Sequence, residues 1–292
     1  MTSLPAALDG RVALVTGASA GIGLAVCREL VAAGARVAMV ARTQSKLEAA
    51  AASLGGGDTG VAFPLDVGDL PALGQLPEQV VARFGRLDVV VNNAGLHHRG
   101  PVAQRSTSDL ATMVKVNLAA PIVLSRAALP LLPRGGAIVN VASLAGFVPL
   151  RDAATYSATK AGLRAFGRAV GEEWKSRGIA VCTVSPGPVD TDFFLDELDE
   201  VTPMTFSQPM STPERVAAAV LECLRSGRRE IAIPWSSSKL ATLAYLSPAA
   251  LEVLRPWMER LGARKKAAYA ATKRAAAAPS QPAAEPGSNI RR

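Results

Sequence analysis

The sequence contains few of the side chains that hold metal ions or form disulfide frameworks. It has three cysteines and two histidines among 292 residues. Cys27, Cys182 and Cys223 are odd in number, lie far apart and occupy apolar segments, so we expect reduced packing residues. His97 and His98 are adjacent, which leaves little material for a histidine-ligated metal centre or a Ser-His-Asp triad. We therefore predict no metal site.

Long apolar runs and an evenly spread charge are also lacking. No run approaches the roughly 20 apolar residues of a membrane span, and no stretch typical of a secretion signal precedes Arg11. We expect a cytoplasmic protein. The net charge of +8 lies mostly after residue 262, where seven basic residues and one acid give +6. Because the remainder is nearly neutral, we expect no nucleic-acid partner.

The sequence does contain many apolar residues, arranged as alternating short strands and longer helices. Hydrophobic residues make up 49% of the chain, which is enough for a sizeable core. Several strand segments are apolar on both faces, as in a parallel sheet that is covered by helices on each side. The expected strands are 11–16, 36–41, 61–65, 87–92, 137–142, 179–185 and 230–233, and the expected helices are 24–33, 71–84, 109–132, 154–177 and 213–226. The pattern predicts an α/β fold, a single-domain, doubly wound, Rossmann-like parallel sheet of about seven strands.

Two segments interrupt this alternation. Residues 190–212 show no periodicity and mix Phe193, Phe194 and Leu195 with acids and prolines, which indicates either a substrate lid or a disordered surface loop. Apolar residues at helical spacing over 251–261, followed by basic residues, predict a helix that packs on the domain, contacts a membrane surface or forms a dimer contact. We thus divide the chain into a Rossmann-like α/β domain (1–235), a helical extension (236–262) and a basic Ala/Pro-rich tail expected to be disordered (263–292).

A glycine-rich turn lies between the first expected strand and the first expected helix. Gly17, Gly21 and Gly23 would let the backbone approach a pyrophosphate, whose charge would meet the free N–H groups of the helix N-terminus. A glycine turn alone is weak support, but its place at the start of a strand-helix-strand unit is the required context.

A second pattern is a Tyr-Lys pair on an expected helix. Tyr156 and Lys160 are four residues apart, so they share one helix face, and Ser143 precedes them at the end of a strand. Such a pair is common on ordinary amphipathic helices, and its meaning depends on the rest of the chain.

Five motifs in register resemble those of the short-chain dehydrogenase/reductase superfamily, over about residues 8–235. They are T-G-x-x-x-G-x-G at 16–23, N-N-A-G at 92–95, Asn117, Ser143 with Tyr156-x-x-x-Lys160, and Pro186-Gly187 followed by Thr191. The resemblance implies that Tyr156 is the general acid/base of a hydride transfer and that Lys160 lowers its pKa and holds the nicotinamide ribose. It also implies that Ser143 orients the substrate oxygen and that Asn117 anchors a proton-relay water.

The resemblance further implies which residues bind the dinucleotide. The expected set is Gly17, Ser19, Gly21, Ile22, Gly23, Arg42, Asp66, Val67, Asn93, Ala94, Gly95, Tyr156, Lys160, Pro186, Gly187, Val189 and Thr191. At the end of the second strand Ala41 stands where an NAD site needs a carboxylate, and Arg42 follows, so NADP(H) is favoured over NAD(H).

We expect an NADP-dependent oxidoreductase that interconverts a carbonyl and a secondary alcohol, with a small-molecule and hydrophobic substrate. A non-catalytic dinucleotide-binding scaffold or redox sensor is the alternative. The resemblance implies a homodimer or homotetramer formed by the helices 109–132 and 154–177. His97, His98 and Arg99 border the expected substrate entrance, where they could meet a polar substrate group or be ordinary surface residues.

Overall fold

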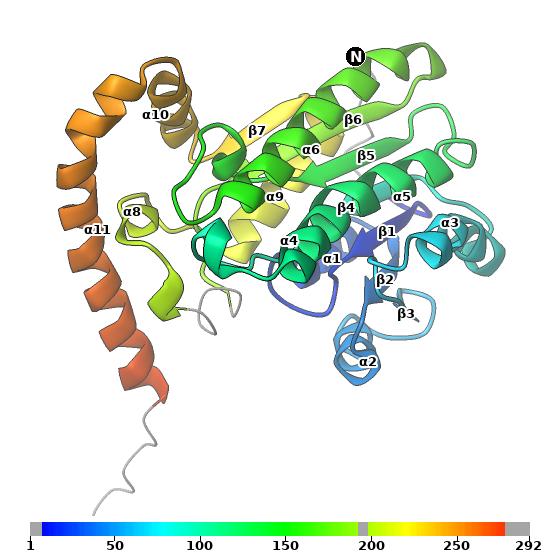
Figure 1. Cartoon of the computed structure of the whole chain (residues 1–292). Coiled ribbons are helices and arrows are strands. Elements are labelled where there is room, and N and C mark those ends of the chain that lie inside the picture. Colours follow the sequence, from blue (N-terminus) through cyan, green and yellow to red (C-terminus); the bar gives the residue numbers. More distant parts are fainter. Residues whose placement is uncertain (1–7, 192–197, 278–292) are drawn as a thin grey trace, which may run out of the picture.

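The computed structural model describes residues 8–191 and 198–277, and within them seven strands form one parallel sheet (Figure 1). The strand order is β3-β2-β1-β4-β5-β6-β7, so the chain crosses back over the sheet between β3 and β4. This order confirms the predicted doubly wound sheet. The strands are β1 (Val12–Thr16), β2 (Arg36–Ala41), β3 (Gly60–Pro64), β4 (Val89–Asn92), β5 (Ala137–Val141), β6 (Ala180–Pro186) and β7 (Glu230–Ile233).

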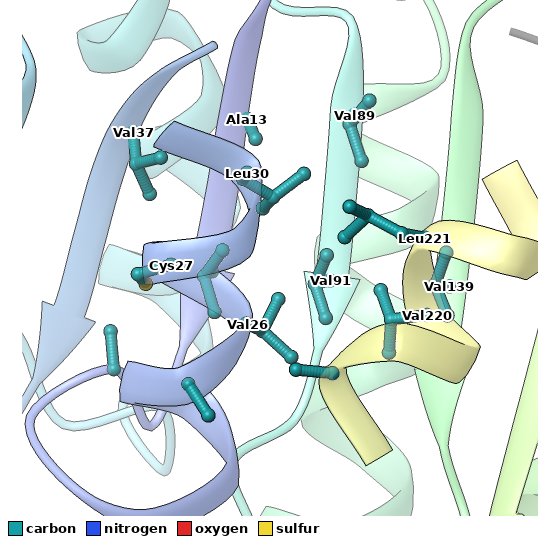
Figure 2. Close-up of a cluster of buried hydrophobic side chains, with 14 of the residues drawn as sticks. Ala13, Val26, Cys27, Leu30, Val37, Val89, Val91, Val139, Val220 and Leu221 are labelled. Atoms are coloured by element: carbon teal, nitrogen blue, oxygen red, sulfur yellow. The ribbon is translucent and has the colours of Figure 1, made fainter. Parts of the chain in front are cut away.

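Successive residues of the strands pack alternately into two separate hydrophobic layers, one on each face of the sheet. Ala13 and Val15 of β1 pack with α1 (Gly21–Ala32), α2 (Gln44–Ala52) and α9 (Pro213–Ser226). Val12 and Leu14 of the same strand pack with α3 (Leu70–Phe84), α5 (Ala120–Ala128) and α6 (Ala154–Glu173). Figure 2 shows part of the first layer, where Leu30 of α1 lies over the strands close to α9. Burial on both faces explains why these strands are apolar throughout.

Local capping signals set the bounds of the helices. Asp69 caps α3 by accepting a hydrogen bond from the Ala72 N–H at 3.1 Å, and the helix ends at Gly85, which has a φ of 81°. Thr212 caps α9 in the same way, and that helix ends at Gly227. An oxygen-bearing N-cap and a left-handed glycine at the C-terminus are the usual boundaries of a helix.

Two helical features differ from the sequence prediction. Helix α2 was not expected, because Leu47 is the only large apolar residue on its alanine-rich segment. The helix expected over 109–132 is divided into α4 (Thr107–Val114), a π-helical turn (Lys115–Ala119) and α5. By length and composition the stretch Thr107–Ala128 could cross a membrane, but α5 packs against α3 as a core helix does.

The C-terminal part forms two further helices, α10 (Trp235–Leu246) and α11 (Pro248–Ala277), with α11 lying against the short α8 (Pro203–Phe206) at one edge of the molecule (Figure 1). Disorder was expected from residue 263, and this is wrong up to Ala277, because alanine favours helix and Tyr269 packs on Phe206. Residues 278–292 lie outside the described residues, as do Phe193, Phe194 and Leu195 of the expected lid.

Candidate active site

The turn between β1 and α1 leaves a helix N-terminus open to an anion. Gly17 and Gly21 have φ values of 66° and 53°, which residues with a side chain rarely adopt. A Cβ atom at Gly23 would lie 2.0 Å from the carbonyl oxygen of Gly17. The N-cap residue of α1 is Ala20, whose side chain makes no hydrogen bond to the first turn of the helix, and this turn contains no acidic residue. The uncapped N–H groups and the positive helix end therefore fit a pyrophosphate.

The loop after β4 forms a second wall beside this turn. Thr16 Oγ1 accepts hydrogen bonds from the backbone N–H groups of Asn93 and Ala94, each at 3.0 Å. The Asn93 side-chain amide donates to the carbonyl oxygens of Thr16 and Gly17 at 2.9 and 3.3 Å. Asn92 points inward instead and bonds to side chains of α5 and β5. Asn93 thus holds the shape of the glycine turn, while Asn92 joins the sheet to a helix.

Asn117 lies on the π-helical turn and is fully buried. Its Oδ1 accepts from the Leu96 N–H and its Nδ2 donates to the Leu96 carbonyl, both at 2.8 Å, and Nδ2 also lies 3.3 Å from Thr159 Oγ1. A Cβ atom at Gly95 would be 3.3 Å from Asn117 Oδ1 and 3.4 Å from Lys160 Nζ. The π turn therefore brings the amide of Asn117 close to the loop after β4 and to Lys160.

Ser143, Tyr156 and Lys160 meet where β5 and α6 approach each other. Ser143 follows β5, and its Oγ accepts a hydrogen bond from the Ala145 N–H at 3.1 Å. Tyr156 and Lys160 lie one turn apart on α6. Lys160 Nζ donates to the Val141 carbonyl at 3.0 Å and lies 5.7 Å from the centroid of the Tyr156 ring. The three residues singled out in the sequence are thus neighbours in space.

Burial governs the proton affinities of Tyr156 and Lys160. It raises the pKa of Tyr156, and a hydrogen bond with Ser143 and the charge of Arg99 oppose this rise with smaller effects. Burial also lowers the pKa of Lys160 to about 8, because a charged ammonium is poorly solvated there. At pH 7 most of the lysine is therefore protonated.

His97 and Arg99 lie inside the protein, next to Tyr156. Their exposed fractions are 9% and 6%, so the alternative of ordinary surface residues is wrong for both. The His97 ring stacks on the Tyr156 ring, with 4.1 Å between centroids and 13° between planes. His98 is more exposed and lies 3.9 Å from Asp109.

The segment after β6 forms the third wall and is tied to the C-terminal helix. The Gly187 N–H donates to the Ile233 carbonyl at 2.7 Å, which fixes the start of this wall. Asp190 accepts hydrogen bonds from the Tyr269 hydroxyl at 2.5 Å and from Lys273 at 3.0 Å. Asp190 and its partners on α11 could not be predicted from the sequence, because no local pattern links residues so far apart in the chain.

A cavity of about 520 Å³ lies between the three walls. It contains most of the predicted cofactor and catalytic positions, namely Gly17, Ser19, Gly21, Ile22, Gly23, Asn93, Ala94, Gly95, Ser143, Tyr156, Lys160, Pro186, Gly187, Val189 and Thr191. Arg42 and Asp66 are exposed outside it, Val67 lines a small adjacent cavity, and Asn117 lies behind the wall.

Comparison with known proteins identifies the family. Residues 11–201 match the family model described as short chain dehydrogenase. Together with the seven-stranded sheet and the register of the motifs, this match shows that the chain belongs to the short-chain dehydrogenase family.

Individual relatives are dehydrogenases and reductases. D-threitol dehydrogenase of Mycolicibacterium smegmatis is 39% identical over 189 residues, or 63% of this chain and 72% of that protein. The ketoacyl reductase HetN of Nostoc is 33% identical over 86% of this chain and 90% of its own. A short-chain dehydrogenase of Burkholderia cenocepacia, solved in complex with NADP, superposes with a TM-score of 0.69 at 32% identity, covering 77% of this chain and 96% of its own.

Proposed function

We propose that the protein is an NADP(H)-dependent oxidoreductase that interconverts a carbonyl and a secondary alcohol, with Tyr156 as the general acid/base. The observation that carries this proposal is that Ser143, Tyr156 and Lys160 line the same cavity as the uncapped N-terminus of α1. One end of the cavity suits a pyrophosphate and the other suits proton transfer.

Tyr156 and Ser143 handle the substrate oxygen in this scheme. A bound nicotinamide would supply the hydride to the carbonyl carbon. Tyr156 gives its phenolic proton to the carbonyl oxygen, which becomes the alcohol hydroxyl, and takes the proton back in the reverse direction. Ser143, whose hydroxyl is within hydrogen-bond reach of Tyr156, turns its single proton to the same substrate oxygen when the substrate binds and holds that oxygen at the phenol.

Lys160 stabilises the phenolate that forms on Tyr156. At 5.7 Å from the ring centroid and an effective dielectric near 20, a unit charge contributes about 3 kcal/mol, or about two pKa units. Its amine also faces the loop that carries Gly95, where it can hold the ribose hydroxyls of the cofactor. Asn117, close behind, anchors the water that returns a proton to Lys160.

The preference for NADP(H) rests on Arg42. Arg42 is exposed and directly follows Ala41, which ends β2. Because Ala41 stands where an NAD site has a carboxylate, no negative charge at that position repels a 2′-phosphate, and Arg42 can pair with it. The NADP in the Burkholderia cenocepacia relative supports this preference. In the same scheme Asp66 and Val67 contact the adenine.

The direct test is NADPH oxidation against a panel of ketones, aldehydes and quinones, with NADH run in parallel. Tyr156→Phe is expected to abolish turnover while NADPH binding, followed by its fluorescence, is retained. Turnover by this variant, or no NADPH binding by the wild type, would refute the proposal. A catalytically silent scaffold would bind NADPH and turn over nothing in the panel.

We propose a hydrophobic substrate, because the C-terminal helices beside the cavity wall are rich in apolar residues. The panel therefore includes long-chain and polycyclic ketones beside small polar ones. A preference for the small polar compounds would contradict this part of the proposal.

The surface also suggests how the protein assembles. Val114 of α4 and Ile122 of α5 are large apolar residues with 44% and 36% exposure. We propose that this surface, with α6, forms a homodimer or homotetramer of a cytoplasmic enzyme. Replacing both residues by Asp should shift the mass measured by light scattering toward the monomer, and an unchanged mass would contradict the proposed interface.

Helices α10 and α11 carry most of the other exposed apolar side chains. Eight of the eleven large exposed hydrophobic residues in the described ranges lie there, including Trp235 at 71% and Trp257 at 64%. Lys239 and Arg264 are exposed on the same helices, so the charge suits an anionic lipid surface and disfavours a second copy of itself. We propose weak contact with such a surface.

Sedimentation with vesicles tests this contact. More of the wild type should sediment with vesicles that contain phosphatidylglycerol than with neutral vesicles. Replacing both exposed tryptophans by Ser should remove this difference. Equal sedimentation with both vesicles, or self-association that the same change abolishes, would contradict the membrane proposal.

A further inference from the structure

The ring of His97 forms one side of the space around Tyr156. Its centroid lies 4.1 Å from that of the phenol ring, and the two planes are nearly parallel at 13°. His97 belongs to the loop after β4, whereas Tyr156 belongs to α6, so the stack joins two separate elements. An aromatic ring held against the phenol restricts its rotation and fixes where its hydroxyl points.

Arg99 orients this imidazole. Arg99 Nη1 lies 2.9 Å from His97 Nδ1, and because a guanidinium only donates, Nδ1 must be the acceptor and the ring proton must sit on Nε2. Nε2 has no hydrogen-bond partner among the described residues, so the bond from Arg99 is the one that sets the orientation of the ring. Burial and the charge of Arg99 lower the pKa of His97 to about 3, which keeps the ring neutral at physiological pH.

The charges around this stack are arranged unequally. Lys160 approaches from α6, and its amine lies 5.7 Å from the phenol centroid. Arg105 and His98 are the other basic groups near His97, but each faces a carboxylate, Arg105 that of Glu200 at 2.7 Å and His98 that of Asp109 at 3.9 Å. Among these groups, Lys160 is the one whose amine lies close to the phenol, and Arg99 is the one whose charge acts on Tyr156 against the effect of burial.

We propose that Arg99 is a positioning residue for Tyr156: through His97 it holds the phenol ring in place, and its buried charge adds to that of Lys160 beside the forming phenolate. The inference deepens the proposed function, in which Tyr156 is the acid/base. It agrees with the effect of Arg99 on the phenol, whose pKa its charge lowers against the rise caused by burial.

The first test is the pH profile of alcohol oxidation, which needs the phenolate. Arg99→Met should move the rising limb upward by about one pH unit, so that kcat on that limb falls about tenfold while KM changes little. Arg99→Lys keeps the charge and should recover most of the shift. His98→Gln, a neighbouring change away from the stack, should leave the profile where it is.

The second test needs no turnover. The sequence has three tyrosines, so the difference between the ultraviolet titrations of the wild type and Tyr156→Phe reports the phenol of Tyr156 alone. The same difference measured in an Arg99→Met background should appear at higher pH. If the wild type had no activity, this shift would still support the role of Arg99 while the proposed function failed.

Two results with Arg99→Met would overturn the inference. One is a folded Arg99→Met variant, with normal NADPH binding, whose profile and tyrosinate titration match the wild type. The other is a rise in KM alone with an unmoved pH profile, since this would make Arg99 a substrate contact. If Arg99→Met does not fold, Arg99→Lys provides the test. A wild-type pH profile in this variant, together with a disrupted stack of His97 on Tyr156 seen by nuclear magnetic resonance of His97, would likewise contradict the positioning role.

Discussion

Replacing His97 by Phe should make the protein more resistant to acid. In the folded protein the pKa of His97 is lowered to about 3 by burial, whereas an unfolded histidine has a pKa of about 6.5. Below pH 6.5 the unfolded chain therefore binds a proton that the folded protein does not. This group lowers the free energy of unfolding as the pH falls from about 6.5 toward 3, and it has no effect above about pH 7.

The size of the effect follows from the difference in bound protons. Between pH 7 and pH 5 the unfolded histidine changes from mostly neutral to almost fully protonated, which costs the folded state about 2 kcal/mol. The same figure of about 2 kcal/mol holds for any folded pKa below about 4, because the buried ring is then still neutral at pH 5. Phenylalanine keeps a ring against Tyr156 and carries no titrating group, so it should remove this loss.

Urea unfolding at pH 7 and pH 5 measures the prediction. The wild type should lose about 2 kcal/mol more than His97→Phe over this interval, whatever the stability of the variant at pH 7. His98→Gln is the matched control, because it removes the adjacent, more exposed histidine and should preserve the wild-type loss. Equal losses for the wild type and His97→Phe would show that His97 accepts a proton in the folded protein, and would refute its assignment as a neutral buried ring.

Three further predictions concern the turn, the cofactor and the C-terminal helix. Gly23→Ala would bring a Cβ to 2.0 Å from the Gly17 carbonyl, so the turn must open, and NADPH affinity measured by fluorescence should fall at least about tenfold. Retained affinity would contradict the phosphate site. Arg42→Ala should reduce the preference for NADPH over NADH by about 10- to 100-fold in kcat/KM, the value of a charge-assisted bond, and an unchanged ratio would remove Arg42 from the cofactor site. Gly262→Ala would place a Cβ 1.8 Å from the Pro203 carbonyl oxygen, so α8 and α11 must move apart. Hydrogen exchange in residues 248–277 should then quicken while the sheet stays protected, and unchanged exchange would contradict the close packing of α8 on α11.

The sheet could be predicted from the sequence because its central strands, β1, β2, β4, β5 and β6, are buried on both faces. The segment Val12–Thr16, for example, is buried at every position and apolar at all but the last, and such segments alternate with helices or glycine turns, so their number and order could be predicted. Helix α2 could not be predicted, because its alanines form a helix without an apolar stripe. The π turn at Lys115–Ala119 escaped because a single extra residue in a helix leaves no signature in hydrophobic spacing.

The cavity residues could be predicted where they sit on short motifs at strand ends. Asn93 and Tyr156, for example, belong to short motifs that can be recognised in the sequence. The sheet then brings these motifs together around the cavity. The stack of His97 on Tyr156 and the bonds of Lys273 to Asp190 depend on tertiary packing between distant segments. Such contacts follow from the folded backbone and not from any local pattern.

The attachment of α11 to Asp190 makes the far end of the chain part of the energetics of the cavity. Asp190 lines the cavity and is held by Tyr269 and Lys273 from the last described turns of that helix. If a ligand binds better when this wall is in place, then it stabilises the docked helix by the same free energy that the docked helix contributes to ligand binding. A partner that pulls α11 away would therefore release the ligand, and saturating ligand would weaken that partner by an equal factor.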